Sequence, residues 1–243
     1  MAERFVDVTS KHGSIPSFLV CPDGDGTWPA IILYMDAPGI REELRNMARR
    51  IAKQGYACLL PDLYHRYGKL RFDLPRRSDA MSNVIKAAYL SLNDGNIDDD
   101  TAGCIGFLDA QPEVRPGKIG SIGYCMSGRF VTTAARSFPD RFACAVSMYG
   151  TRLVVDEPDS PHLDLKGITA EMYYAFGTLD ATTPPDYIET FTKSLDGAGV
   201  NYSMDIFEDV DHGFAFVERA PYDPHAAEVS WAKTFELFGR TLR

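Results

Sequence analysis

The stretch "KIGSIGYCMSGRFVTTAARS", residues 118–137, predicts a strand, a sharp turn and a helix in immediate succession. Residues 117–124 are mostly apolar or small, as in a strand buried within a sheet, and residues 126–138 suit a helix. Cys125 lies at the turn, with Gly123 and Ser127 two residues away on either side and Gly128 next. Small residues at these positions let the chain turn sharply and expose the side chain at its apex.

Cys125 therefore has the position of a nucleophile at such a turn. The N-terminus of the following helix directs its positive dipole end at the thiol, which favours the reactive thiolate. A buried cysteine that only fills space is the alternative, and this stretch alone leaves both open. The other cysteines lie in or near apolar runs, where packing is the simpler interpretation: Cys21, Cys58, Cys104 and Cys144.

Outward from this stretch, apolar runs and amphipathic segments alternate along the chain. After a predicted hairpin at 4–20, strands are expected at 29–36, 56–62, 117–124, 142–150, 170–177 and 201–209. Helices are expected at 41–55, 98–111, 126–138, 184–199 and 226–240. This alternation predicts an α/β fold with a mostly parallel central sheet flanked by helices on both faces. In such a sheet, chemistry gathers at the carboxyl ends of the strands.

The length of 243 residues predicts one domain spanning 1–243. Residues 66–95 do not fit the alternation, and we expect them to leave the sheet edge as a lid-like excursion.

Composition excludes several classes of partner. The net charge of −9 disfavours nucleic acid, because phosphate binding needs a basic face. No apolar run is long enough for a signal peptide or a membrane span. The five cysteines are an odd number without CxxC spacing, which indicates neither a disulfide framework nor a metal site. A cytoplasmic protein is expected, as a monomer or small homo-oligomer.

A thiol nucleophile needs a base and an orienting acid. His212 follows the strand at 201–209, and Asp180 follows the strand at 170–177. The order Cys125, Asp180, His212 is that of the α/β-hydrolase fold, and each residue comes at the end of a strand. His212 would take the thiol proton and Asp180 would hold the imidazole tautomer. Asp186 is the main competitor as the acid, while His162 is interpreted as a solvated loop residue.

These motifs resemble those of the dienelactone hydrolase family, a branch of the α/β-hydrolase fold. "GYCMSGR" is similar to its cysteine elbow, "GTLDATTP" to its acid loop and "DHGF" to its histidine loop, and the resemblance runs from about residue 30 to the C-terminus. The resemblance implies hydrolysis of a lactone or small ester through an acyl-enzyme, without metal or organic cofactor.

The chain departs from the family pattern at two places. Asp36 stands where the family has a glutamate that contacts the resting thiol. The backbone N–H groups of Ala37 and Met126 would form the oxyanion hole. After His212 the family's dienelactone-specific members carry an arginine within a few residues, whereas here the first arginine is Arg219. The substrate need not be dienelactone itself.

An anionic substrate stays under consideration because of a basic segment, which contains Arg66, Lys69, Arg71, Arg76 and Arg77. Arg76 and Arg77 are candidates for binding a substrate carboxylate, with a solvated basic loop as the alternative. Tyr64 and Phe214 are candidate pocket residues, and the protein core is their alternative location.

Two other functions remain open. The same triad could cleave a thioester. A non-catalytic or redox-sensing protein would use Cys125 differently, but no obvious resolving cysteine lies near it.

Overall fold

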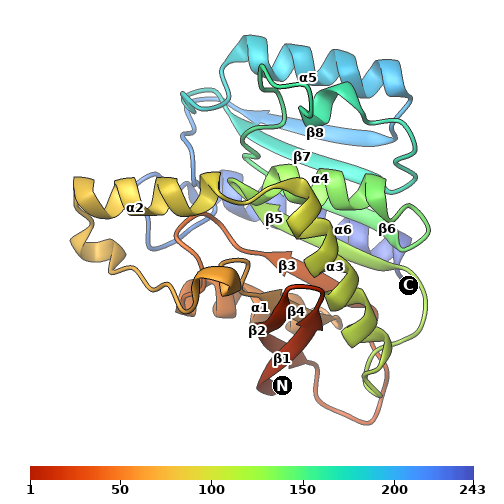
Figure 1. Ribbon diagram of the computed structural model, residues 1–243. Helices are drawn as coiled ribbons and strands as arrows, with labels where there is room; N and C mark the ends of the chain where they lie inside the picture. Colours follow the sequence, from red (N-terminus) through yellow and green to blue (C-terminus); the bar gives the residue numbers. More distant parts are fainter. The chain divides into compact units, whose positions relative to one another are not determined.

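Strands and helices alternate along most of the chain, as Figure 1 shows for the computed structural model, which describes residues 1–243. Residues 1–117 and 118–243 form two units, called here the N-terminal and C-terminal units.

The N-terminal unit contains the predicted hairpin. Its strands follow the order β1-β2-β4-β3, with β1 antiparallel to β2, β2 antiparallel to β4 and β3 parallel to β4. Every residue of β3 and β4 is buried, as their continuous apolar sequences predict. The bounds are β1 (Ala2–Ser10), β2 (Gly13–Cys21), β3 (Ala30–Tyr34) and β4 (Ala57–Pro61).

Two long helices pack on these strands. Helix α1 (Glu42–Lys53) contacts β2 and β4, and its predicted apolar stripe, which includes Leu44 and Ile51, is buried. Helix α3 (Asp94–Asp109) contacts β1 and β4. It begins before the predicted start at residue 98, because the side chain of Asn93 accepts the N–H of Asn96 at 2.9 Å and caps the helix there.

The segment at 66–95 is mostly exposed and carries one α-helix. The 3-10 turns η1 (His65–Tyr67) and η2 (Leu74–Arg76) precede α2 (Asp79–Leu90). Ile85 is the one buried residue of α2. The excursion from the sheet edge and its lid function stay predictions.

The C-terminal unit has four parallel strands in sequence order, β5-β6-β7-β8. They are β5 (Ile119–Tyr124), β6 (Phe142–Met148), β7 (Glu171–Gly177) and β8 (Tyr202–Phe207). Because the strands are parallel, their carboxyl ends share one edge, and the loops that follow β5, β7 and β8 carry Cys125, Asp180 and His212.

Helices cover both faces of these strands. Helix α4 (Ser127–Ser137) contacts β5 and β6, while α6 (Pro224–Thr241) contacts β6 and β7. Figure 1 shows α4 and α6 on opposite sides of β6, with α5 (Pro185–Ala198) beside β7 and β8. The 3-10 turn η3 (Pro161–Leu163) lies in the loop between β6 and β7.

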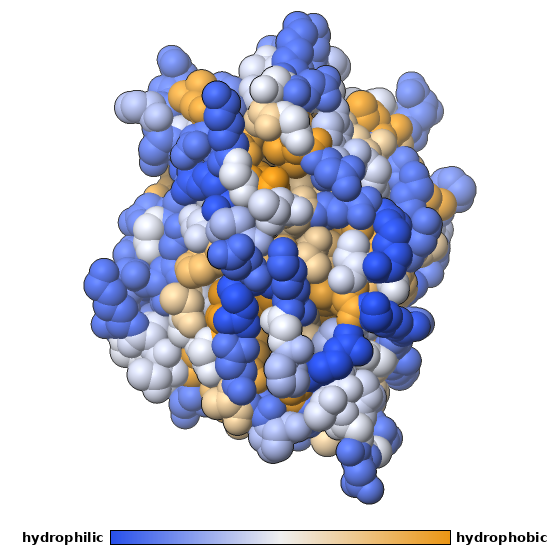
Figure 2. Space-filling model, turned by 90° about the vertical axis from the view of Figure 1, so that its right-hand side faces the viewer, coloured by the Kyte–Doolittle hydropathy of each residue, from blue (hydrophilic) through white to orange (hydrophobic).

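Polar residues predominate on one face of the molecule. Figure 2 shows one face, on which hydrophilic side chains predominate and hydrophobic atoms show mainly in the spaces between them. None of the helices combines the length and the apolar character that crossing a membrane requires.

Candidate active site

Cys125 occupies a strained turn between β5 and α4. Its φ angle is +56°, a left-handed conformation that costs a non-glycine residue about 1–2 kcal/mol. The backbone around it over-determines this conformation. The N–H of Cys125 donates to the carbonyl of Met148 at 3.0 Å, and its own carbonyl accepts the N–H groups of Gly128 at 3.1 Å and Thr151 at 3.0 Å. The turn leaves the thiol partly exposed, while the other four cysteines are buried.

The small residues around the turn are required by close backbone approach. A Cβ atom on Gly123 would lie 2.5 Å from the carbonyl oxygen of Ser127. A Cβ atom on Gly128 would lie 2.2 Å from the Cα of Gly150 in the loop after β6. Neither position has room for a side chain, so the elbow geometry depends on both glycines.

His212 and Asp180 meet at the carboxyl ends of β8 and β7. Nδ1 of His212 lies 2.7 Å from Oδ2 of Asp180, whose side chain is 0% exposed. The other carboxylate oxygen, Oδ1, accepts the N–H of Thr182 at 2.8 Å and its hydroxyl at 2.6 Å. Asp180 is therefore held on both oxygens, with His212 donating from Nδ1 and leaving Nε2 free for another partner.

That partner is Cys125, which makes a side-chain hydrogen bond with His212. Burial alone would lower the pKa of His212, but the electrostatic interaction with Cys125 and the hydrogen bonds with Asp180 and Cys125 raise it to about 10. Burial would raise the pKa of Asp180, yet the hydrogen bond and charge of His212 hold it below its ordinary value. These contacts thus favour the protonated form of His212 beside the Asp180 carboxylate.

Thr182 contacts both Asp180 and His212, and it was not predicted from the sequence as a site residue. Its hydroxyl lies 3.3 Å from Nδ1 of His212 in addition to binding Asp180. The signal was present in "DATT", because a hydroxyl residue two positions after an aspartate commonly closes a turn with it.

Aromatic rings pack behind the histidine. The ring of Tyr149 meets His212 edge to face at 5.0 Å, and Phe214 meets Tyr149 in the same way at 4.9 Å. Phe214 is 0% exposed, which is the core location weighed against a pocket role. Substrate contact by Phe214 stays a prediction.

The side chain of Arg219 lies against the histidine loop, although Arg219 comes seven residues after His212 in the sequence. Gly213, the residue after His212, has a φ of +92°, and a Cβ atom there would lie 2.7 Å from Nη1 of Arg219. The guanidinium is half-buried against this glycine and makes no ion pair or hydrogen bond with another side chain.

Asp36 is engaged by an arginine of its own unit. Its side chain is 0% exposed, and Arg41 binds its two oxygens from Nη1 at 2.5 Å and Nη2 at 3.0 Å. Nearby, the buried hydroxyl of Tyr64 donates to the carbonyl of Ala37 at 2.7 Å. The expected roles of Asp36 and the Ala37 N–H toward the thiol, and of Tyr64 toward substrate, stay predictions.

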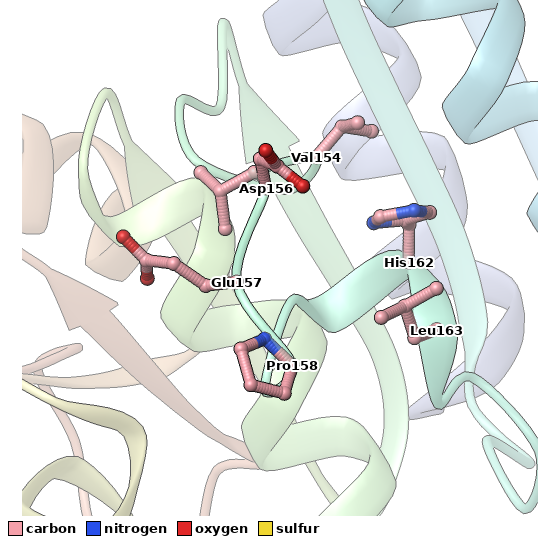
Figure 3. A pocket seen from close by; sticks show the side chains of 7 residues that line it. Val154, Asp156, Glu157, Pro158, His162 and Leu163 are labelled. Carbon is pink, nitrogen blue, oxygen red and sulfur yellow. The ribbon is translucent and has the colours of Figure 1, made fainter.

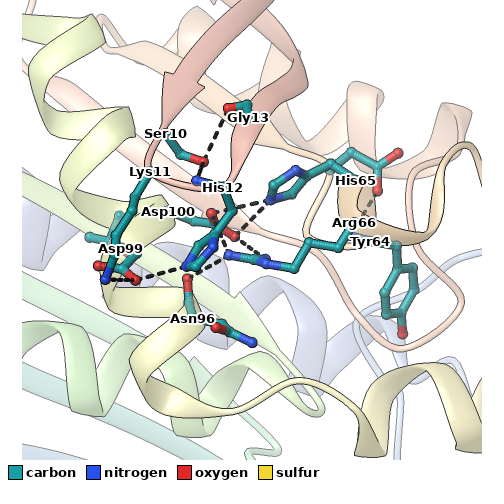
Figure 4. A network of polar contacts seen from close by, with 12 residues as sticks. Ser10, Lys11, His12, Gly13, Tyr64, His65, Arg66, Asn96, Asp99 and Asp100 are labelled. Carbon is teal, nitrogen blue, oxygen red and sulfur yellow. Dashed lines mark hydrogen bonds and ion pairs between the residues drawn. The ribbon is translucent and has the colours of Figure 1, made fainter.

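The arginines of the basic segment mostly have carboxylate partners. Figure 4 shows Arg66 and His65 converging on Asp100, which is 1% exposed and lies 2.7 Å from Nη1 of Arg66. Arg76 pairs with Asp73 at 2.5 Å, and Nε of Arg77 donates to the hydroxyl of Ser82 at 2.9 Å. Arg66 therefore anchors the segment, while Arg76 and Arg77 are exposed and their binding role stays a prediction.

The loop after β6 forms a pocket of about 540 Å³. Figure 3 shows His162 and Leu163 facing Asp156 and Glu157 across it. Nδ1 of His162 lies 2.6 Å from the hydroxyl of the buried Ser160. His162 is partly exposed and lines this pocket, and its interpretation as a solvated loop residue stays a prediction.

Comparison with known proteins identifies the family of this chain. The model of the "Dienelactone hydrolase family" matches residues 15–242. The chain belongs to the dienelactone hydrolase family. Its fold is accordingly the α/β-hydrolase fold, and it is a dienelactone hydrolase-like hydrolase acting on ester bonds of small molecules.

Individual relatives align over nearly the whole chain. A Synechocystis sp. protein named "Putative carboxymethylenebutenolidase" is 28% identical, covering 98% of this chain and 96% of its own. A Bradyrhizobium sp. protein named "Probable 2-oxo-3-(5-oxofuran-2-ylidene)propanoate lactonase" is 26% identical, over 96% and 92% of the two chains. The crystal structure named "Putative Dienelactone Hydrolase" from Klebsiella pneumoniae superposes with a TM-score of 0.88 at 23% identity, over 98% of each chain, and shows the same fold.

Proposed function

We propose that this hydrolase cleaves a lactone or small carboxylic ester with Cys125 as nucleophile, His212 as base and acid, and Asp180 as the group that orients His212. The observation that carries the proposal is that His212 bonds to Asp180 through Nδ1 and also to the Cys125 thiol. A residue that only packed would need neither the strained backbone of Cys125 nor a buried carboxylate behind the histidine.

The first half of the reaction forms an acyl-enzyme. In the resting pair Nε2 of His212 holds the proton taken from the thiol, and Sγ of Cys125 attacks the carbonyl carbon as a thiolate, forming a C–S bond. In this proposal the N–H of Met126, at the start of α4, donates to the oxyanion that develops. The C–O bond then breaks, and the leaving oxygen takes the proton from His212. In a lactone, this oxygen stays attached to the acyl group.

The second half releases the acid. His212 accepts a proton from water, and the resulting hydroxide attacks the thioester carbon. The C–S bond breaks, and the proton stays on Nε2 of His212 beside the released sulfur of Cys125. Asp180 stays ionised throughout, which accords with its lowered pKa and its fully occupied oxygens.

The substrate carries a carboxylate in this proposal. Arg219 supports it, since its guanidinium lies against Gly213 beside His212 without an anionic partner. A half-buried guanidinium is stabilised by an anion that hydrogen bonds to it. The lactonase named among the relatives acts, by its name, on a propanoate.

Mass spectrometry of the protein mixed with a slowly cleaved aryl ester tests the nucleophile. We expect the mass of one acyl group on the peptide that contains Cys125 and no turnover by Cys125→Ala. Cys21→Ala serves as the matched control, because it removes a buried thiol of β2 and should keep turnover. Full hydrolysis by Cys125→Ala would refute the mechanism and favour a binding or sensing role.

A further inference from the structure

A second pocket lies behind the loop that holds Asp180. It has a volume of about 460 Å³, within the range of sites that bind small molecules. Its walls come from that loop, from the first turns of α5 and from β8. Apolar wall comes from Ile188 and Ile206, and Thr183 and Thr192 also line it. Ile206 is 51% exposed, so the pocket is open to solvent at β8.

Thr183 is the unusual member of this lining. It is 1% exposed, and its hydroxyl is buried without a hydrogen-bond partner. Buried hydroxyl groups nearly always have a partner, because leaving one unpaired costs free energy. The other threonines of the pocket have partners: Thr178 accepts the N–H of Asp209 at 2.9 Å, and Thr192 donates to the sulfur of Met204 at 3.8 Å.

The charged residues that line the pocket give no preference for an ionic ligand. Glu189 and Lys193 are its charged lining residues, and they pair with each other at 2.5 Å one helical turn apart on α5. Both side chains are mostly exposed. An ionic ligand would therefore find no unpaired opposite charge in the pocket, whereas an uncharged ligand would lose little by entering it.

We propose that this pocket binds a small, uncharged, mostly apolar molecule carrying one hydroxyl or carbonyl group, which pairs with the hydroxyl of Thr183. The apolar body of the ligand would lie against Ile188 and Ile206. The site is separate from the triad, although the two share a loop: the N–H of Thr183 donates to the carbonyl of Asp180 at 3.1 Å. The proposal does not depend on the identity of the nucleophile.

The test uses calorimetric titration of the full chain with 1-naphthol and with 1-methylnaphthalene, which has the same shape without the hydroxyl. We expect 1-naphthol to bind the wild-type protein at concentrations below about 1 mM. Thr192→Phe fills the pocket from α5 and should weaken binding by about tenfold or more. Thr190→Phe is the matched control, because Thr190 is exposed on the same helix and does not line the pocket.

Thr183→Val tests the hydrogen bond while preserving the shape of the side chain. We expect it to weaken 1-naphthol binding by about 2- to 12-fold and not to weaken 1-methylnaphthalene binding. Ester hydrolysis by Thr192→Phe shows that this variant is folded. Absence of 1-naphthol binding to the wild-type protein, or equal binding by Thr192→Phe and Thr190→Phe, would overturn the proposal.

Discussion

Nδ1 of His212 lies 2.7 Å from a carboxylate oxygen of Asp180 that has no solvent exposure. This contact fixes the imidazole so that Nε2 is the nitrogen available to Cys125. The same carboxylate is restrained on its other oxygen by Thr182. Orientation of the base therefore depends on one short loop after β7.

Asp180→Asn should lower kcat by about 10²- to 10⁴-fold, because an amide neither balances the imidazolium charge nor favours the required tautomer. Steady-state hydrolysis of an aryl ester gives this value. Asp186→Asn is the matched control: Asp186 is exposed in the first turn of α5 and was the competing candidate for the acid. Its kcat should stay within about twofold of wild type. The opposite pattern would transfer the orienting role to Asp186.

Because folding raises the pKa of His212, the free energy of unfolding should fall as the pH rises into the alkaline range. The pKa of His212 is raised from 6.5 to about 10 in the folded protein, so the folded state keeps a proton that the unfolded chain loses. The stabilisation is complete below pH 6.5 and is lost as the pH rises through about 10.

Urea unfolding of wild type and His212→Gln across this range measures the effect. The difference between their free energies of unfolding should shrink by an amount on the order of 3 kcal/mol as the pH rises. A difference that stays constant with pH would show that His212 gains no proton affinity on folding.

Limited alkylation with iodoacetamide should label Cys125 first, with activity falling in step. The other thiols are buried, and burial raises the pKa of Cys21 to about 11 and that of Cys144 to about 12. Burial also raises the pKa values of Cys58 and Cys104. Peptide mapping at one label per chain locates the site. A first label on any of these four cysteines would contradict the prediction.

Gly213→Ala should impair catalysis as well as stability. The residue has a φ of +92°, and a Cβ atom would press on the guanidinium of Arg219 at 2.7 Å. The guanidinium is the end of a flexible side chain and should be displaced, which should lower kcat/KM for a carboxylated lactone by about 10- to 100-fold. Gly199→Ala is the control that measures the cost of the backbone conformation without a steric clash, because Gly199 has a φ of +70° and no atom within 4 Å of the added Cβ. It should cost about 1 kcal/mol of stability and leave kcat/KM unchanged.

The strand–turn–helix at Cys125 was predictable because its signals are local. Alternating strands and helices, the two small residues around the thiol and the order of acid and histidine can all be counted along the chain. The start of α3 was missed because the cap, Asn93, lies outside the acidic run that marked the helix. Thr182 and Arg219 were missed as site residues for a different reason. Their positions depend on how two loops fold back, and no periodicity records that.

The positively charged segment shows the same limit. Arginines that are close in sequence indicated an anionic substrate, but Arg66 and Arg76 are already paired with Asp100 and Asp73. Sequence distance also gave little weight to Arg219, although Gly213 lets the chain bring its guanidinium beside the histidine loop. Which cation is unpaired is a property of the tertiary structure, and only the structure could supply it.

The last prediction concerns Arg219 and the charge of the substrate. Arg219→Met keeps much of the length and apolar volume of the side chain and removes the charge. If the guanidinium binds a substrate carboxylate, KM for a carboxylated lactone should rise by about 10- to 100-fold, since a charge-assisted hydrogen bond contributes about 1.5–3 kcal/mol. KM for a neutral lactone of the same ring size should not change. Arg76→Met and Arg77→Met belong in the same series, because both were candidates from sequence and both are exposed. A rise in KM confined to either of these variants would return the carboxylate site to the basic segment, and equal rises for both lactones in Arg219→Met would show that Arg219 supports the loop rather than the substrate.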